Sequence, residues 1–95
     1  MEPTIGDVVL VLRGRDAGRP MVVVGQDGDR LLLADGVHRL LARPKSKNAR
    51  HVRHLESAGL WFERLKNGQW SDADMRQVLR EFETHAKGGK EDAER

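Results

Sequence analysis

The spacing of hydrophobic residues divides the chain into two parts at about residue 56. Between residues 5 and 55, short aliphatic runs alternate with turn residues, which is typical of β-strands. The runs predict strands over residues 8–12, 21–24, 31–34 and 37–41, and a short fifth strand at about 51–55. Asp35-Gly36 separates the third run from the fourth, and this pair readily adopts the positive φ angles of a hairpin turn. Five short strands joined by tight turns predict a small barrel of the SH3-like type.

After residue 57 the spacing changes to that of helices. The apolar residues of 58–65 lie at positions i, i+3, i+4 and i+7, which predicts one helix, and Gly68 follows where a C-terminal cap belongs. A second helix is predicted to begin at Ser71, because Ser71 and Asp74 form a capping box and Trp70 and Met75 can form a hydrophobic staple. Neither helix is long enough to be stable alone, so each must pack on the other or on the barrel.

The predicted fold class is therefore α+β, with a small SH3-like β-barrel followed by a C-terminal two-helix hairpin and a short disordered tail. The predicted boundaries are 1–56 for the barrel, 57–85 for the hairpin and 86–95 for the tail, where no apolar period remains. A chain of 95 residues without cysteine has no disulfides and no thiolate chemistry. No apolar run approaches the roughly 20 residues of a membrane helix, so we expect a cytoplasmic protein without membrane contact.

Positive charge is concentrated in the first part of the chain. The net charge is only +2, but residues 36–55 hold six Lys and Arg side chains and no acid. This segment includes a polar, basic stretch at 43–48, where Pro44 cannot donate a ladder hydrogen bond. An acid-free cationic segment is suited to a polyanionic partner, although a solvated edge strand carries the same composition.

A glycine loop over residues 14–19 precedes this segment. Gly14 and Gly18 permit backbone conformations closed to other residues, and Arg15 and Arg19 offer forked donors that suit phosphate oxygens. A nucleotide-binding P-loop does not fit, because Gly18 is followed by Arg-Pro and not by Lys-Ser or Lys-Thr.

The blocks from residue 14 onward resemble the KOW motif of small bacterial RNA-binding proteins related to archaeal and eukaryotic large-subunit ribosomal proteins. Six short blocks occur in order within residues 5–55: Gly-Arg-Asp-x-Gly-Arg at 14–19, Val-Val-Gly at 23–25, Leu-Ala-Asp-Gly at 33–36, Arg-x-Leu at 39–41, Pro-Lys-x-Lys at 44–47 and His-x-x-His-Leu at 51–55. Ala17 stands where the family often has lysine, and Ser46 and Asn48 make the linker less basic than is usual.

This resemblance implies a barrel that binds RNA, ribosomal RNA above all, without catalysis or a cofactor. The residues expected to contact RNA are Arg15, Arg19, Arg39, Arg43, Lys45, Lys47, Arg50 and Arg53, and those expected to shape the loops are Gly14, Gly18 and Gly36. The alternative is a protein-interaction module that docks on the transcription or translation machinery, including ribosomal proteins. The oligomeric state stays open.

Other chemistry receives little support from the sequence. His51 and His54 are three apart, which on a strand places them on opposite faces, and no cysteine or nearby acid completes a metal site. Ser46 and Ser57 lie near histidines, but nothing indicates the carboxylate that would orient a catalytic base. No aromatic residue precedes position 61, so recognition by base stacking is not available to the predicted barrel.

Overall fold

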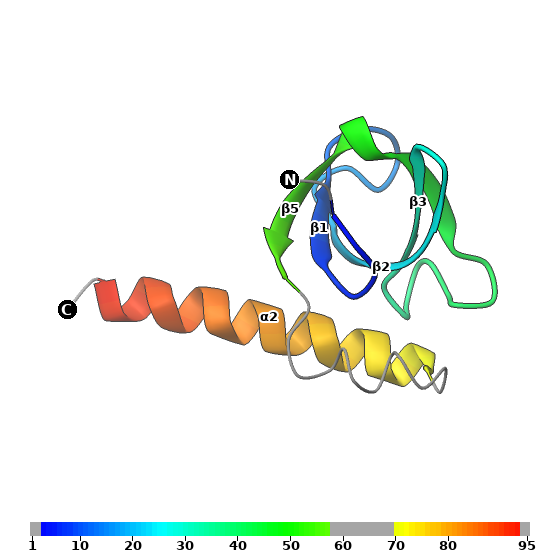
Figure 1. Ribbon diagram of the computed structural model, residues 1–95. Helices are drawn as coiled ribbons and strands as arrows, with labels where there is room; N and C mark the ends of the chain where they lie inside the picture. The colour runs from blue at the N-terminus through cyan, green and yellow to red at the C-terminus, as the bar shows by residue number, and fades with distance from the viewer. Residues whose placement is uncertain (1–2, 58–69, 94–95) are drawn as a thin grey trace.

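The computed structural model describes residues 3–57 and 70–93, and the side chains among them up to residue 85. Five strands, one short 3-10 helix and one α-helix make up these residues (Figure 1). They are β1 (Val8–Val11), β2 (Pro20–Asp27), β3 (Arg30–Ala34), β4 (Lys45–Asn48), η1 (Ala49–His51), β5 (Val52–Glu56) and α2 (Asp72–Ala93).

The strands form one antiparallel sheet in the order β4-β3-β2-β1-β5. The prediction of a closed barrel is wrong, because the two edge strands β4 and β5 do not pair and η1 connects them instead. Lys45 and Lys47 stand opposite Leu33 and Leu31 in the ladder, on the face that those leucines bury. Charged side chains on the core-facing side of an edge strand oppose further strand pairing, which accounts for the open edge.

The fourth strand lies later in the chain than predicted. Residues 37–41 form no strand, because Asp35 Oδ1 accepts hydrogen bonds from the backbone N–H groups of Val37, His38 and Arg39 at 2.9, 2.8 and 2.8 Å. The backbone N–H groups of Asp35 and Gly36 in turn donate to Arg39 O. These local hydrogen bonds occupy the backbone N–H and C=O groups that would otherwise pair with a neighbouring strand. The strand forms instead at β4, directly after Pro44.

Two hydrophobic clusters lie on opposite faces of the sheet. The first contains Val9, Val11, Met21, Val23, Leu31, Leu33 and Val52. The second contains Val8, Val22 and Ala34, which lie side by side in register, together with Met75 and Val78 of α2. Because α2 covers one face while the sheet curves around the other cluster, β1 and β2 are buried on both sides (Figure 1). This explains why their sequences are continuous aliphatic runs.

Helix α2 begins at the predicted capping box. Asp74 N donates to Ser71 Oγ at 3.2 Å, and Ser71 N donates to Asp74 Oδ2 at 2.9 Å. Trp70 and Met75, the predicted staple pair, both belong to the second cluster. Asp72 Oδ1 also accepts the Leu41 N–H at 2.8 Å, which fixes the start of the helix to the loop that follows β3.

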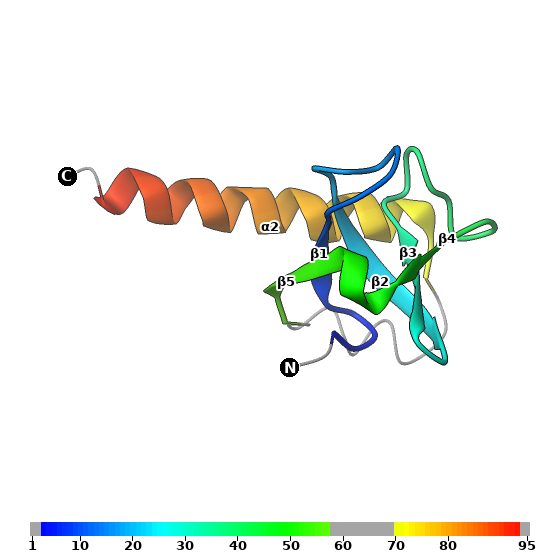
Figure 2. The same cartoon turned by 90° about the horizontal axis from the view of Figure 1, so that it is seen from above.

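The predicted arrangement of a barrel followed by a two-helix hairpin is therefore replaced by an open sheet covered by α2. The other predicted helix, over 58–65, lies outside the described residues. Helix α2 continues to Ala93, past residue 86 where the predicted tail begins, and its second half extends away from the sheet (Figure 2). The described helices include none with the length and apolar character needed to cross a membrane.

Candidate nucleic-acid interface

The glycine loop connects β1 to β2 at one end of the sheet. Gly14 and Gly18 both have positive φ angles, 89° and 86°, where other residues are strained. The loop is closed by backbone hydrogen bonds from Ala17 N to Gly14 O and from Gly18 N to Val11 O. This tight backbone leaves the side chain of Arg15 exposed to solvent.

Asp16 joins this loop to the loop that follows β3. It is only 1% exposed, and its Oδ2 accepts from Arg39 Nε at 3.1 Å and from Arg39 Nη2 at 2.9 Å, a two-pronged guanidinium–carboxylate pair. Arg19 Nη1 lies 3.4 Å from Asp16 Oδ1. Burial alone raises the pKa of Asp16, but the hydrogen bond and charge of Arg39, with the charges of Arg19 and Lys45, bring that pKa below its ordinary value. Asp16 therefore remains a carboxylate that neutralises part of the surrounding positive charge.

Strand β4 presents its lysines toward the same loop. A Cβ atom placed on Gly14 would lie 2.5 Å from Lys47 Nζ, so the ammonium group of Lys47 lies directly over the glycine. Lys45 is close enough to Asp16 for its charge to lower the pKa of that carboxyl. Residues that are far apart in sequence thus form one surface, which we call the cationic surface: the 12–19 loop with Lys45 and Lys47.

The remaining predicted RNA contacts have separate positions. Arg43 is exposed in the loop before β4, where its N–H donates to Leu40 O. Arg50 and Arg53 are exposed on η1 and β5, so Arg53 lies at the edge of the sheet opposite to β4. Within the described residues, six of the eight predicted cations form no salt bridge with any carboxylate, including those of α2: Arg15, Arg43, Lys45, Lys47, Arg50 and Arg53.

Two residues of this region were not singled out from the sequence. Arg13 is exposed next to Gly14 and, in the part of the chain that is described, has no salt bridge, so it adds a charge to the cationic surface. Its position at the start of the glycine loop is the signal that could have found it. The role of Asp16 was also missed. The only local sign that it forms an ion pair is the presence of Arg15 and Arg19 nearby in the sequence.

A Ser-His-Asp group surrounds His54 of β5 but lacks the geometry of a catalytic triad. His54 Nε2 lies 3.3 Å from Ser57 Oγ and 3.3 Å from Asp7 Oδ2. A triad needs the serine and the carboxylate on different ring nitrogens, so that one orients the base while the other loses its proton. Among the described residues, no group of three or more His, Asp or Glu side chains is placed to hold a metal ion.

Comparison of the chain with protein-family models finds no match, and comparison with curated proteins finds no relative. The functional argument therefore rests on the residues of the cationic surface.

Proposed function

We propose that this protein binds RNA, with ribosomal RNA as the first candidate, through the cationic surface and the flanking cations Arg43, Arg50 and Arg53. The observation that supports this proposal is the position of Lys47 Nζ over Gly14, which groups the lysines of β4 with the arginines of the glycine loop. Such a protein would act in the cytoplasm, as an accessory of the ribosome.

The charge balance of this surface favours a polyanionic partner. Its one buried carboxylate, Asp16, is already occupied by Arg39 and Arg19, so the other cations have no internal counter-charge in the described part of the fold. A strand of phosphates supplies that counter-charge and releases its own condensed ions on binding.

The positions of the aromatic side chains indicate what kind of contact to expect. The two aromatic side chains that the structure describes, Trp70 and Phe82, pack against the second hydrophobic cluster, and neither belongs to the cationic surface. Contact at the cationic surface therefore involves phosphates, sugar hydroxyls and guanidinium planes, which recognise the shape of the strand more than its sequence.

The test is RNA binding by a variant that removes four of the predicted cations: Arg43→Ala, Lys45→Ala, Lys47→Ala and Arg50→Ala. Fluorescence anisotropy with labelled ribosomal RNA fragments should show a loss of affinity on the order of 100-fold at 0.1 M salt. The side chains are exposed or half-buried and have no salt bridges among the described residues, so urea denaturation should show an intact fold.

A matched control removes the same charge from the acid-rich end of the chain: Lys66→Ala, Lys87→Ala, Lys90→Ala and Arg95→Ala. This control should bind RNA nearly as well as the natural protein. Equal affinity of both variants would contradict the proposal, as would a protein partner whose binding survives both sets of substitutions and high salt.

A further inference from the structure

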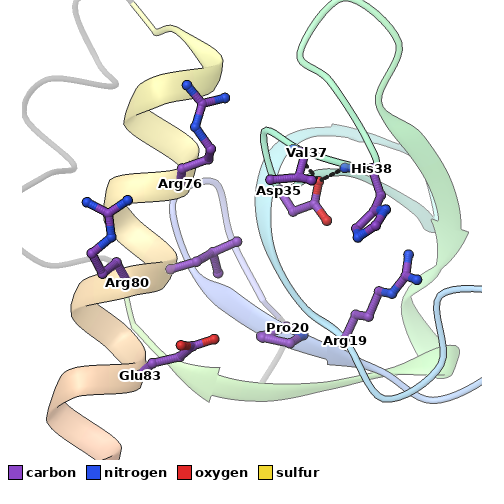
Figure 3. Close-up of a pocket in the computed structure, with 9 residues that line it drawn as sticks. Arg19, Pro20, Asp35, Val37, His38, Arg76, Arg80 and Glu83 are labelled. Carbon is purple, nitrogen blue, oxygen red and sulfur yellow. Dashed lines mark hydrogen bonds between the residues drawn. The ribbon is translucent and has the colours of Figure 1, made fainter.

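A cavity of about 390 Å³ lies between α2 and the loops at the start of β2 and the end of β3. Pro20 and Val37 line it from the sheet side (Figure 3). Leu79 of α2 also lines it. Val37 is 61% exposed, so its side chain is accessible to a ligand from solvent. The cavity therefore has apolar side chains on both sides and is open to solvent, as suits the faces of a flat ligand.

Cationic groups border these apolar side chains. Arg19 and Arg76 line the cavity, and each uses few of its N–H donors. Arg19 has one contact of 3.4 Å with Asp16, and Arg76 Nη1 donates to Gly36 O at 2.7 Å. A guanidinium group has five N–H donors, so both retain donors for an anion. Asp35 also lines the cavity, but its Oδ1 already accepts three backbone N–H groups.

Glu83 is the remaining acid of the cavity. Its carboxylate points from α2 toward Pro20, across from Arg19 and His38 (Figure 3). Glu83 is exposed and forms no salt bridge within the described residues. An ionised carboxylate only accepts hydrogen bonds, so it favours a ligand that presents an N–H group at this position.

We propose that this cavity holds one unpaired nucleotide whose base carries an exocyclic amino group. The base lies between Pro20 and Leu79, its phosphate binds Arg19, and its amino group donates to Glu83. The proposal rests on the proposed function, because Arg19 belongs both to the cationic surface and to the lining of the cavity. An RNA strand bound to that surface can therefore place one nucleotide in the cavity. Cytosine presents an amino group where uracil presents a carbonyl, which a carboxylate repels, so Glu83 selects cytosine over uracil.

The first test compares two free nucleotides of nearly equal size, cytidine monophosphate and uridine monophosphate. Titration followed by ¹H–¹⁵N NMR should shift the backbone amide signals of Val37 and His38, and cytidine monophosphate should bind about tenfold more tightly. Glu83→Gln should abolish this preference, because a glutamine amide both donates and accepts. Glu81→Gln, an exposed position of α2 outside the cavity, is the matched control and should retain it.

The second test uses labelled single-stranded oligocytidine and oligouridine at one salt concentration. If the nucleotide belongs to a bound strand, oligocytidine binds more tightly, and Val37→Asp removes the difference while Ile5→Asp, an exposed aliphatic position elsewhere, does not. If only the free nucleotides show the preference, the same cavity serves a free nucleotide. The inference would be overturned if cytidine monophosphate and uridine monophosphate bind the natural protein with equal affinity and Glu83→Gln leaves both affinities unchanged. The proposed function would still stand if the four-cation variant then loses affinity for both oligonucleotides.

Discussion

At the scale of single residues, Asp16 determines how the two cationic loops lie relative to each other. A carboxylate that is 1% exposed is stable in the fold only when its oxygens are paired, and here Arg39 and Arg19 pair with it from different loops. Arg39 thus stabilises the fold, whereas Arg19, with one contact of 3.4 Å, and the cations that have no salt bridges in the described residues are available to a ligand. Sequence alone did not separate the two groups, since every one of these side chains carries the same charge.

Asp16→Asn should lower the free energy of unfolding by about 1–3 kcal/mol at pH 7, because Arg39 loses its charged acceptor. The folded-state pKa of Asp16 lies below its value in the unfolded chain, about 3.9. The stabilisation by the carboxylate is therefore fully present above that pH and is lost as the pH falls through the folded-state pKa.

Urea denaturation of Asp16→Asn and the natural protein between pH 7 and pH 2 measures this effect, and the two stabilities should converge toward the acid end. Asp27→Asn removes an exposed carboxylate of the β2–β3 hairpin and should change stability by less than about 0.5 kcal/mol. A difference between Asp16→Asn and the natural protein that stays constant down to pH 2 would contradict this explanation.

Gly36 is a second residue whose position in the fold does not accommodate a side chain. Its φ angle is 79°, and a Cβ atom there would collide with Asp72 O of α2. Gly36→Ala should therefore cost at least about 1 kcal/mol more than Gly28→Ala, which has a φ angle of 61° but no atom within 4 Å of the added Cβ. Chemical denaturation of both variants checks this, and equal losses would show that only the backbone conformation matters.

At the scale of elements, α2 is required because the sheet has two apolar faces. The row formed by Val8, Val22 and Ala34 is buried only because Met75 and Val78 cover it. The helix is fixed at its start by Asp72, which accepts the Leu41 N–H, and by Arg76, which donates to Gly36 O. The loop after β3 is thus held between the sheet and the helix.

Met75→Ala should destabilise the protein by about 2–5 kcal/mol, because Met75 is fully buried and its removal leaves a cavity in the second cluster. Gln77→Ala, on an exposed position of the same helix, should change stability by less than about 0.5 kcal/mol. Thermal or urea unfolding compares the two variants. A small effect of Met75→Ala would mean that α2 does not cover the sheet in solution.

At the scale of the whole molecule, positive and negative charge are separated. Residues 36–55 carry six cations and no acid, and no carboxylate of α2 that is described forms a salt bridge with them. The net charge of +2 conceals this separation. A polyanion therefore meets a local positive field that the overall composition does not indicate.

The affinity for RNA should fall with salt at a log–log slope of roughly −3 to −4 if about five cations neutralise phosphates of a single strand. Arg15→Ala should make this slope shallower by about 0.7 without changing stability, since Arg15 is exposed and has no salt bridge in the described part of the chain. Lys90→Ala should leave the slope unchanged. Anisotropy titrations over a series of salt concentrations measure all three proteins, and a slope near zero would favour an apolar interface.

The amino-acid sequence by itself determined the local features of this protein. Four of the five strands and the capping box at Ser71 follow from aliphatic runs and a hydroxyl–carboxylate spacing. Each of these depends on interactions within a few residues, so the information lies in short segments. The cationic composition of residues 36–55 is local in the same sense.

Only the tertiary structure decided the features that depend on residues far apart in the chain. Val37 and Leu40 suit a strand by composition, but Asp35 binds the backbone of this segment, and β4 forms from the polar residues after Pro44 instead. The edge of the sheet stays open because Lys45 and Lys47 occupy core-facing positions of β4. Which arginine pairs with Asp16 and which faces solvent likewise depends on where the loops meet, because burial and charge pairing are set by neighbours in space.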